Sequence, residues 1–314
     1  MAAPSIVRLL VLVAGAGALS VTPQRTTQRR SPAASGLSRR AALSSAAVAL
    51  CTAPLATSEP ATAASTKATL EATGKVVVVG GDGFIGSRVC RELTRLSGVS
   101  VLAVSRTHDQ PPSWAASEPW AGNVKWVAAD ALKDDYGPLL EGATTVVSCL
   151  GTLGSADDRT GNGDANARLS AAAKKAGAKR FVYIGVNSLV GEIGMSVLPE
   201  YFAGKAAADA AITADFGAHA TIFRPTLVYG GDVFNVNPPR VPAGYGGVIE
   251  GLLSSPPLRF LAEAFSPVPA IKVALLPPVY VDRMAAAVAV AALGGGPAGS
   301  VEGRDAINAV AASA

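Results

Sequence analysis

Residues 75–86, KVVVVGGDGFIG, decide the fold of this chain. Four consecutive valines favour a buried strand, and the apolar positions of residues 87–96 favour a helix directly after the turn. Gly80, Gly83 and Gly86 lie in that turn, where glycine permits positive φ, brings the backbone close to a pyrophosphate and lets the helix pack on the strand. A strand, this turn and a helix in that order predict dinucleotide binding, whereas the alternative is a purely structural glycine turn.

Short apolar strands alternate with helical segments in the following part of the chain. Further strands are predicted at 99–104, 124–128, 145–149, 181–185 and 220–223, and helices at 164–176 and 199–215. This alternation predicts an α/β fold, a doubly wound parallel sheet with helices on both faces, which is a Rossmann fold. After Gly230 the alternation fails, and Pro and Gly cluster in 237–247. We therefore expect a nucleotide-binding Rossmann core at 67–230 and a small, irregular C-terminal substrate cap at 231–314, which completes the same domain without extending the sheet.

The charge of the chain separates residues 1–66 from the rest. The 314 residues are 49% hydrophobic and 16% charged, which excludes a disordered protein. The first 66 residues hold six of the 27 basic residues and one of the 23 acidic residues, so the remaining 248 carry a net charge of −1. The formal charge of +4 therefore belongs to the N-terminal segment, and the rest gives no electrostatic reason to expect a nucleic acid as partner.

Residues 1–66 have the composition of a targeting segment. An apolar stretch at 6–19 resembles the core of a signal peptide, and a basic, hydroxyl-rich segment follows it at 22–38. A second, milder apolar stretch at 41–56 follows Arg39-Arg40, as in twin-arginine signals of the thylakoid lumen. We expect a cleaved leader that directs the protein to a plastid (chloroplast), with the lumen as a narrower address and a mitochondrion as the alternative, and no transmembrane helix in the mature chain. The cysteines and histidines show no metal-ligand spacing, so no metal site is expected.

The end of the second predicted strand bears on the choice of nicotinamide cofactor. Chains that bind NAD place an acidic residue about 20 residues beyond the glycines, where it bonds the ribose 2′-hydroxyl, whereas a basic residue accepts the 2′-phosphate of NADP. This chain has Ser105-Arg106 there and no acid before Asp109. Arg106 can bind a phosphate with two nitrogens and Ser105 can donate to it, while Arg88 is either a third contact or a solvated helix residue. NADP(H) is therefore favoured over NAD(H).

Ordered motifs across residues 75–290 resemble the atypical or extended branch of the short-chain dehydrogenase/reductase superfamily. The glycine turn resembles its cofactor loop, residues 224–230 (RPTLVYG) its R-P-x-x-V-Y-G motif, and residues 277–282 (PPVYVD) its late P-x-x-V-D element. In that family the pair Asp130-Ala131 contacts the adenine, and Cys149-Leu150-Gly151 lines the cofactor. The resemblance implies that a nicotinamide dinucleotide is bound by Gly80, Gly83, Phe84, Ile85, Gly86, Ser105, Arg106, Asp130, Ala131, Cys149, Leu150, Gly151, Lys205, Pro225, Thr226 and Val228.

The same resemblance assigns catalytic roles to Tyr201, Lys205 and Ser188. Tyr201 and Lys205 are four residues apart and share one helix face, so the ammonium is expected to lower the pKa of the phenol, which exchanges a proton with an alcohol or carbonyl. The alternative is a core tyrosine beside a surface lysine. Ser188 is expected to hydrogen-bond the substrate oxygen, although Asn187 can do the same and Ser188 can equally be an ordinary turn residue.

Within the superfamily, residues 81–84 (GDGF), the pair Tyr201-Phe202 and the leader resemble one group. It contains uncharacterised chloroplast proteins, a coenzyme Q biosynthesis accessory protein and the NADPH-binding accessory subunit of respiratory complex I. The resemblance implies a plastid NADP(H)-dependent oxidoreductase that acts on an unknown small molecule, apolar and quinone- or isoprenoid-like. The alternative is a non-catalytic NADPH-binding accessory protein of a membrane complex or quinone pathway. Epimerase- or dehydratase-like chemistry is a third reading.

Overall fold

A computed structural model describes residues 74–106, 108–153, 155–196, 198–231, 235–236, 239–256, 258 and 273–313. The predicted leader at 1–66 lies outside the described residues, and so do parts of the predicted cap. Among the described residues, no helix is long and apolar enough to cross a membrane.

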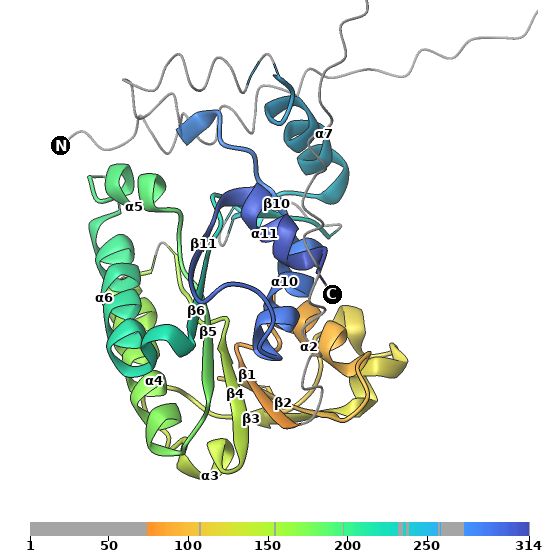
Figure 1. Ribbon diagram of the computed structural model, residues 1–314, viewed down its shortest axis with the longest axis vertical. Helices are drawn as coiled ribbons and strands as arrows, with labels where there is room; N and C mark the ends of the chain where they lie inside the picture. Colours follow the sequence, from red (N-terminus) through yellow and green to blue (C-terminus); the bar gives the residue numbers. More distant parts are fainter. Residues whose placement is uncertain are drawn as a thin grey trace, which may run out of the picture. The chain divides into compact units, whose positions relative to one another are not determined.

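A seven-stranded, fully parallel sheet forms the centre of the fold (Figure 1). Its strand order is β11-β6-β5-β4-β1-β2-β3, so the chain runs outward from β1 in one direction and then returns to build the other half. The strands are β1 (Gly74–Val79), β2 (Val99–Ser105), β3 (Val124–Ala128), β4 (Ala143–Ser148), β5 (Arg180–Ile184), β6 (Ala220–Arg224) and β11 (Gly299–Glu302). The predicted doubly wound α/β fold is confirmed, and the six predicted strands lie within two residues of their observed ends.

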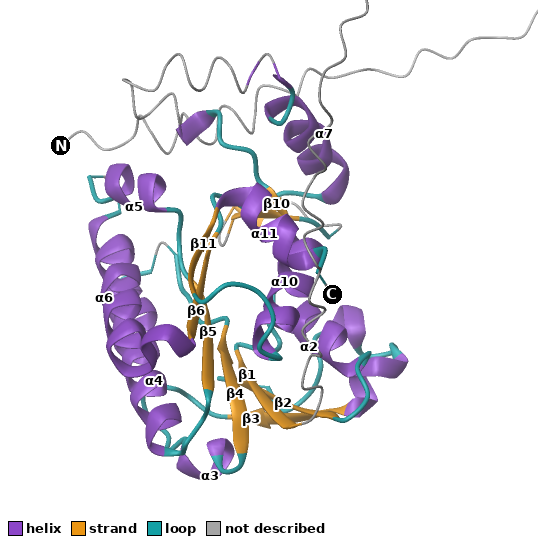
Figure 2. Ribbon diagram, viewed as in Figure 1, coloured by secondary structure: helices purple, strands orange, loops and turns teal. Residues whose placement is uncertain are grey.

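Helices cover both faces of the sheet (Figure 2). One face packs on α2 (Gly86–Thr94), α10 (Val281–Ala292) and α11 (Gly303–Ala311), and the other on α3 (Gly137–Leu140), α4 (Ala165–Lys175) and α6 (Pro199–Phe216). The valines of β1 divide between the two cores, since Val76 and Val78 face the first and Val77 and Val79 the second. All four are at most 1% exposed, which is why this strand reads as a continuous apolar run rather than an alternating one.

The C-terminal part of the chain corrects one prediction. Residues 299–302, β11, extend the sheet beside β6, with Val301 opposite Phe223, so the expectation that nothing after Gly230 adds to the sheet is wrong. Only Val301 of this strand is buried, so it carries too little apolar sequence to be recognised. Helix α10 is buried on nearly all sides and therefore lacks the one-sided apolar pattern of a surface helix.

The described parts of the cap region attach to the core through short elements. Strands β7 (Val228–Tyr229) and β10 (Val279–Tyr280) pair in parallel, one just before the cap region and one within it. Helix α7 (Ala243–Leu253) packs a glycine, Gly246, against the ring of Tyr229, where a Cβ would lie 2.0 Å from the ring. The remaining elements are β8 (Asn235–Val236), β9 (Pro239–Arg240), α5 (Ser188–Gly194) and the short helical turns η1 (Ser113–Ala115), η2 (Pro119–Asn123), η3 (Thr160–Asp164) and η4 (Gly217–His219).

Candidate active site

The predicted site residues gather at one edge of the sheet. Because every strand is parallel, all carboxyl ends meet there, and this is the edge at which ligands bind in open α/β sheets. The glycine turn follows β1, Arg106 follows β2, Asp130 follows β3, Cys149 follows β4 and Asn187 follows β5. Residues 225–228 follow β6.

The glycine turn has the close backbone contacts that its sequence predicts. Gly80 has φ +82°, and a Cβ on it would lie 2.9 Å from the carbonyl oxygen of Cys149. A Cβ on Gly86 would lie 2.1 Å from the carbonyl oxygen of Gly80. Two backbone hydrogen bonds from Gly80 and Gly81 to the Val104 oxygen, 2.7 and 3.1 Å, fix the turn to the end of β2. Glycine is therefore required at Gly80 and Gly86 by the fold of the turn itself.

The start of α2 fits an anion. Helix α2 has no side-chain cap and no acidic residue in its first turn. Among the described residues, the structure shows no acceptor for the backbone N–H groups of Ile85 and Gly86. Unpaired N–H groups at a helix N-terminus, together with the positive end of the helix dipole, favour a phosphate. The turn thus fits the pyrophosphate of a dinucleotide on both sterics and electrostatics.

Three residues are expected to bind the 2′-phosphate. One of them has an exposed side chain, and the other two contact other residues of the protein. Arg106 is exposed at the end of β2. Ser105 is 4% exposed, and its Oγ accepts a 3.1 Å hydrogen bond from the N–H of Asp82, so it supports the glycine turn. The Arg88 side chain is 12% exposed and contacts Phe84, Trp114 and Asp282. The alternative that Arg88 is a solvated helix residue is therefore wrong.

The turns after β3 and β4 are built from buried or hydrogen-bonded groups. Asp130 accepts a 2.9 Å hydrogen bond from the N–H of Leu132 through its carboxylate, and Ala131 is buried. The N–H of Cys149 donates to the Val79 oxygen over 2.8 Å, which brings this turn against the glycine turn. Burial raises the pKa of the Cys149 thiol to about 12, so it is held as a neutral group.

Lys205 reaches the turn after β4 from helix α6. The residue is only 6% exposed, and its Nζ donates to the Ile184 oxygen over 3.0 Å and to the Leu150 oxygen over 3.4 Å. A Cβ on Gly151 would lie 3.3 Å from this Nζ, so the ammonium lies directly against Gly151. Burial lowers the pKa of Lys205 to about 8, against the opposing pull of Asp209.

Tyr201 lies one helical turn before Lys205 on α6 and is partly buried against the edge of the Phe202 ring, 4.9 Å between centroids. Burial, and secondly the negative charge of Asp158, raise the pKa of Tyr201 to about 12. The prediction that Lys205 lowers this pKa is therefore wrong for this structure. The phenol keeps its proton throughout the neutral range.

Ser188 makes contacts other than those its predicted role requires. Its Oγ donates to Glu302 Oε2 over 3.0 Å and accepts from Arg224 Nη1 over 2.9 Å, and its N–H donates to Glu302 Oε1 over 2.6 Å. Glu302 belongs to β11, the strand that was not predicted. The neighbouring Asn187 is buried, and its Oδ1 accepts from the N–H of Val190 and so caps α5.

The three expected cofactor residues after β6 support the cap region. The Pro225 oxygen accepts from the N–H of Asn187 over 3.0 Å, and Thr226 Oγ1 donates to the Pro277 oxygen over 2.9 Å. Val228 pairs with Val279 in the β7–β10 ladder. These residues connect the end of β6 to the return of the chain from the cap.

Sequence reasoning missed Asn162, a fully buried amide in a π-helical turn, η3, directly before α4. Its Nδ2 donates to the oxygens of Asp158, 2.7 Å, and Thr152, 2.8 Å, while its Oδ1 is buried without a partner among the described residues. A Cβ on Gly151 would lie 3.1 Å from that Oδ1 and 3.3 Å from Lys205 Nζ. An acceptor and a donor therefore face the same small residue. A π turn is a frequent mark of functional sites, but no short sequence signal announces it.

Comparison with known proteins finds similar chains in two organisms. The chain is 34% identical over 216 residues to an uncharacterized chloroplastic protein of Arabidopsis thaliana, covering 68% of this chain and 70% of that protein. It is 44% identical over 81 residues to MIOREX complex component 2 of Saccharomyces cerevisiae, covering 25% of this chain and 29% of that protein.

A solved structure supports the fold. The UDP-N-acetylglucosamine 4-epimerase from Methanobrevibacter ruminantium, in complex with UDP-N-acetylmuramic acid, superposes with a TM-score of 0.50 at 18% identity, covering 73% of this chain and 76% of the epimerase. The family model for NAD(P)H binding matches residues 80–237, from the first glycine of the turn to the start of the cap region. With the glycine turn, the open start of α2 and the parallel sheet, this match shows that the chain belongs to the NAD(P)H-binding family and carries an NAD(P)-binding Rossmann domain.

Proposed function

We propose that the protein is an NADP(H)-dependent oxidoreductase of a plastid, with Tyr201 and Lys205 as its acid–base pair. The observation that carries this proposal is the position of Lys205, a buried ammonium on α6 whose Nζ lies against Gly151 in the turn after β4. A buried charge is costly, and here two backbone oxygens hold it at the edge of the sheet where the cofactor binds. A purely structural residue at this position would need no charge.

The protonation states of the pair favour carbonyl reduction. The high pKa of Tyr201 keeps its phenol protonated at neutral pH, so Tyr201 can donate a proton to the oxygen of a carbonyl. Lys205 lies one turn further along the same helix and supplies positive charge beside the developing alkoxide. A bound nicotinamide dinucleotide supplies or accepts the hydride.

NADP(H) is proposed over NAD(H) because of the residues after β2. The segment offers the exposed guanidinium of Arg106 and presents no acid for the ribose 2′-hydroxyl. Ser105 is still able to donate through its hydroxyl hydrogen, because its oxygen is the acceptor in the hydrogen bond from the N–H of Asp82.

A plastid location is proposed from the N-terminal composition and from the chloroplastic relative. The substrate class that we propose is an apolar carbonyl compound, quinone- or isoprenoid-like. The apolar residues that α7 exposes in the cap region, Val248 and Leu252, support this class.

The test of the proposal is a set of four titrations followed by a turnover assay. NADPH, NADP, NADH and NAD are titrated into the protein, and NADPH oxidation is then followed with a panel of quinones, aldehydes and ketones. Tyr201→Phe should reduce turnover by orders of magnitude while NADPH affinity changes little, because only the proton donor is removed. Equal turnover in this variant would remove Tyr201 from the reaction.

A second function is supported by a separate observation. The Ser188 hydroxyl is engaged by Glu302 and Arg224, and part of the chain resembles a protein named as a component of a complex. Both fit a non-catalytic NADPH-binding accessory protein. That function predicts tight NADPH binding without turnover of any carbonyl and co-purification with partner proteins at constant stoichiometry. Turnover of a free small molecule would rule it out.

A further inference from the structure

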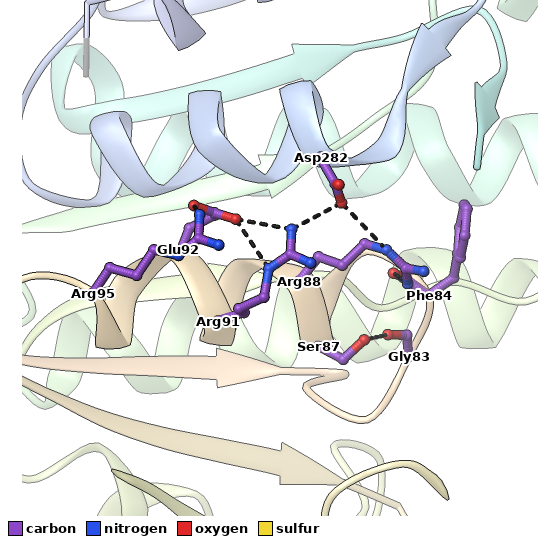
Figure 3. Close-up of polar contacts among 8 residues, drawn as sticks. All are labelled: Gly83, Phe84, Ser87, Arg88, Arg91, Glu92, Arg95 and Asp282. Carbon is purple, nitrogen blue, oxygen red and sulfur yellow. Dashed lines mark hydrogen bonds and ion pairs between the residues drawn. The ribbon is translucent and has the colours of Figure 1, made fainter. Parts of the chain in front are cut away.

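We propose that Asp282 is a positioning residue for the nucleotide phosphate loop and acts through Arg88. Asp282 lies in the first turn of α10, far in sequence from the glycine turn, yet its carboxylate faces helix α2 (Figure 3). Its Oδ1 lies 3.5 Å from Arg88 Nε and 2.9 Å from Arg91 Nη2. The inference rests on nucleotide binding, the part of the proposed function that the family match supports, and not on its chemistry.

Arg88 connects Asp282 to the backbone of the glycine turn. Its Nη1 donates a 2.8 Å hydrogen bond to the carbonyl oxygen of Phe84, which is inside the G-x-x-G-x-x-G segment. Its guanidinium also stacks on the rings of Phe84 and Trp114, with its central carbon 4.8 and 4.7 Å from their centroids. The planar guanidinium is therefore held by an aromatic ring on each of two segments and by one carboxylate.

The position of Arg88 requires an electrostatic explanation. A cation in the first turn of a helix is unfavourable, because the helix dipole is positive at that end. Asp282 provides the opposite charge from a neighbouring helix, and the Arg88 side chain is 12% exposed while that of Asp282 is 35% exposed, so solvent screens the pair only in part. The pair therefore sets where Arg88 lies, and Arg88 in turn fixes the carbonyl of Phe84 next to the N–H groups that face the phosphate.

Both ends of the cap region reach this same group. Gly231, where the cap region begins, is close enough that a Cβ on it would lie 3.4 Å from Arg88 Nη2 and 3.8 Å from the Phe84 ring. Asp282 follows directly after β10, where the chain returns from the cap region. The glycine turn is thus connected through Arg88 to Gly231 and Asp282, which lie shortly after β7 and β10 respectively.

The experiment measures the affinity of the full chain for ADP-ribose and NADP by calorimetry. ADP-ribose contains the pyrophosphate but no nicotinamide, so its binding is independent of any turnover. The variants are Asp282→Asn, Arg88→Met, their double variant and Asp282→Glu. The control is Arg95→Met, which removes an exposed arginine directly after α2 that pairs with Glu92. The unfolding midpoint of each variant is measured without ligand.

Asp282→Asn and Arg88→Met should each weaken ADP-ribose binding about tenfold, which is about 1.4 kcal/mol. The double variant should be no weaker than either single variant, since both remove the same link. Asp282→Glu restores the carboxylate and should recover affinity to within about threefold of the wild type, and the control should change it by less than about twofold. If Asp282 and Arg88 had a purely structural role, the variants would lower the unfolding midpoint, and the effects of the two single variants on ADP-ribose affinity would not be coupled in the double variant.

Three results would overturn the proposal. Unchanged affinity in Asp282→Asn would show that the pair does not act on the loop. Tighter binding would show that Asp282 acts only as a repelling charge near an anion. Additive losses in the double variant would show that Asp282 does not act through Arg88. Failure of the wild type to bind ADP-ribose would overturn nucleotide binding itself, whereas binding without turnover would affect only the proposed reaction.

Discussion

The glycine turn and the set of Tyr201, Lys205 and Ser188 differ in how they are built. The turn lies within residues 80–86, and the close contacts that require its glycines are with backbone atoms, the oxygens of Gly80 and Cys149. The second set takes its residues from α5 and α6, and the polar contacts of Ser188 and Lys205 lie on other strands or turns. The geometry of a backbone motif can be predicted from its local sequence. The geometry of a side-chain site depends on which elements, distant in sequence, pack beside it.

The comparison is tested most severely at Gly86. A Cβ there would lie 2.1 Å from the Gly80 oxygen, which is backbone and cannot move aside without opening the turn. Gly86→Ala should lower the free energy of unfolding by about 3 kcal/mol and weaken dinucleotide binding by about 100-fold or more. Urea unfolding and NADPH titration measure the two effects.

The matched control for this variant is Gly122→Ala. A Cβ on Gly122 meets no heavy atom within 4 Å and its φ is not positive, so the change should alter stability by less than about 0.5 kcal/mol. If Gly86→Ala were tolerated as well as Gly122→Ala, the turn would not be fixed by its backbone contacts.

Lys205 provides the next largest effect, which depends on pH. Burial lowers its pKa from an ordinary 10.5 to about 8, so between these values the unfolded chain binds more protons than the folded one. Stability should therefore rise with pH from about 8 to about 10.5, by about 3 kcal/mol over the whole window, and the penalty of the buried charge is fully present below pH 8.

The measurement compares the wild type with Lys205→Met by urea unfolding at pH 7 and pH 9.5. The stability of the wild type relative to the variant should increase by about 2 kcal/mol between these values. Lys174→Met is the control, because Lys174 is exposed beside Asp215 and should give no such difference. A constant difference at the two pH values would mean that Lys205 is not desolvated.

Particular residues show how far sequence reasoning reaches. The valines of β1 and the spacing of Gly80, Gly83 and Gly86 predict the first βα unit, because both signals are local. The strand β11 was missed because only Val301 is buried in it. Because β11 was not predicted, its residue Glu302, which is the main partner of Ser188, was not predicted either. The buried Asn162 and the direction of the Tyr201 pKa depend on the packing of η3 against α6, which has no short sequence signature.

Arg106 tests whether a single side chain at the sheet edge selects the cofactor. Arg106→Ala should weaken NADPH binding by about 10- to 100-fold, because the 2′-phosphate loses a charge-assisted contact, and should leave NADH binding almost unchanged. Equal losses for both cofactors would indicate that Arg106 stacks on the adenine, which both share. A wild type that prefers NADH would contradict the NADP(H) proposal directly. Arg95→Ala, at an exposed position directly after α2, serves as the control.

The smallest effect on stability is expected for a substitution of Ser188. The same substitution tests whether Ser188 has a structural role or takes part in the reaction. The hydroxyl links Arg224 to Glu302 in an exposed position, so Ser188→Ala should lower the free energy of unfolding by about 0.5–1 kcal/mol. Glu302→Gln keeps the shape but weakens the same contacts, so the double variant should lose less than the sum of the single losses. Urea unfolding of the four proteins measures this coupling. A loss of turnover of two decades in Ser188→Ala, at unchanged stability, would instead place Ser188 with Tyr201 in the reaction. The contacts with β11 would then rearrange when substrate binds, since one hydroxyl hydrogen cannot serve both Glu302 and a substrate oxygen.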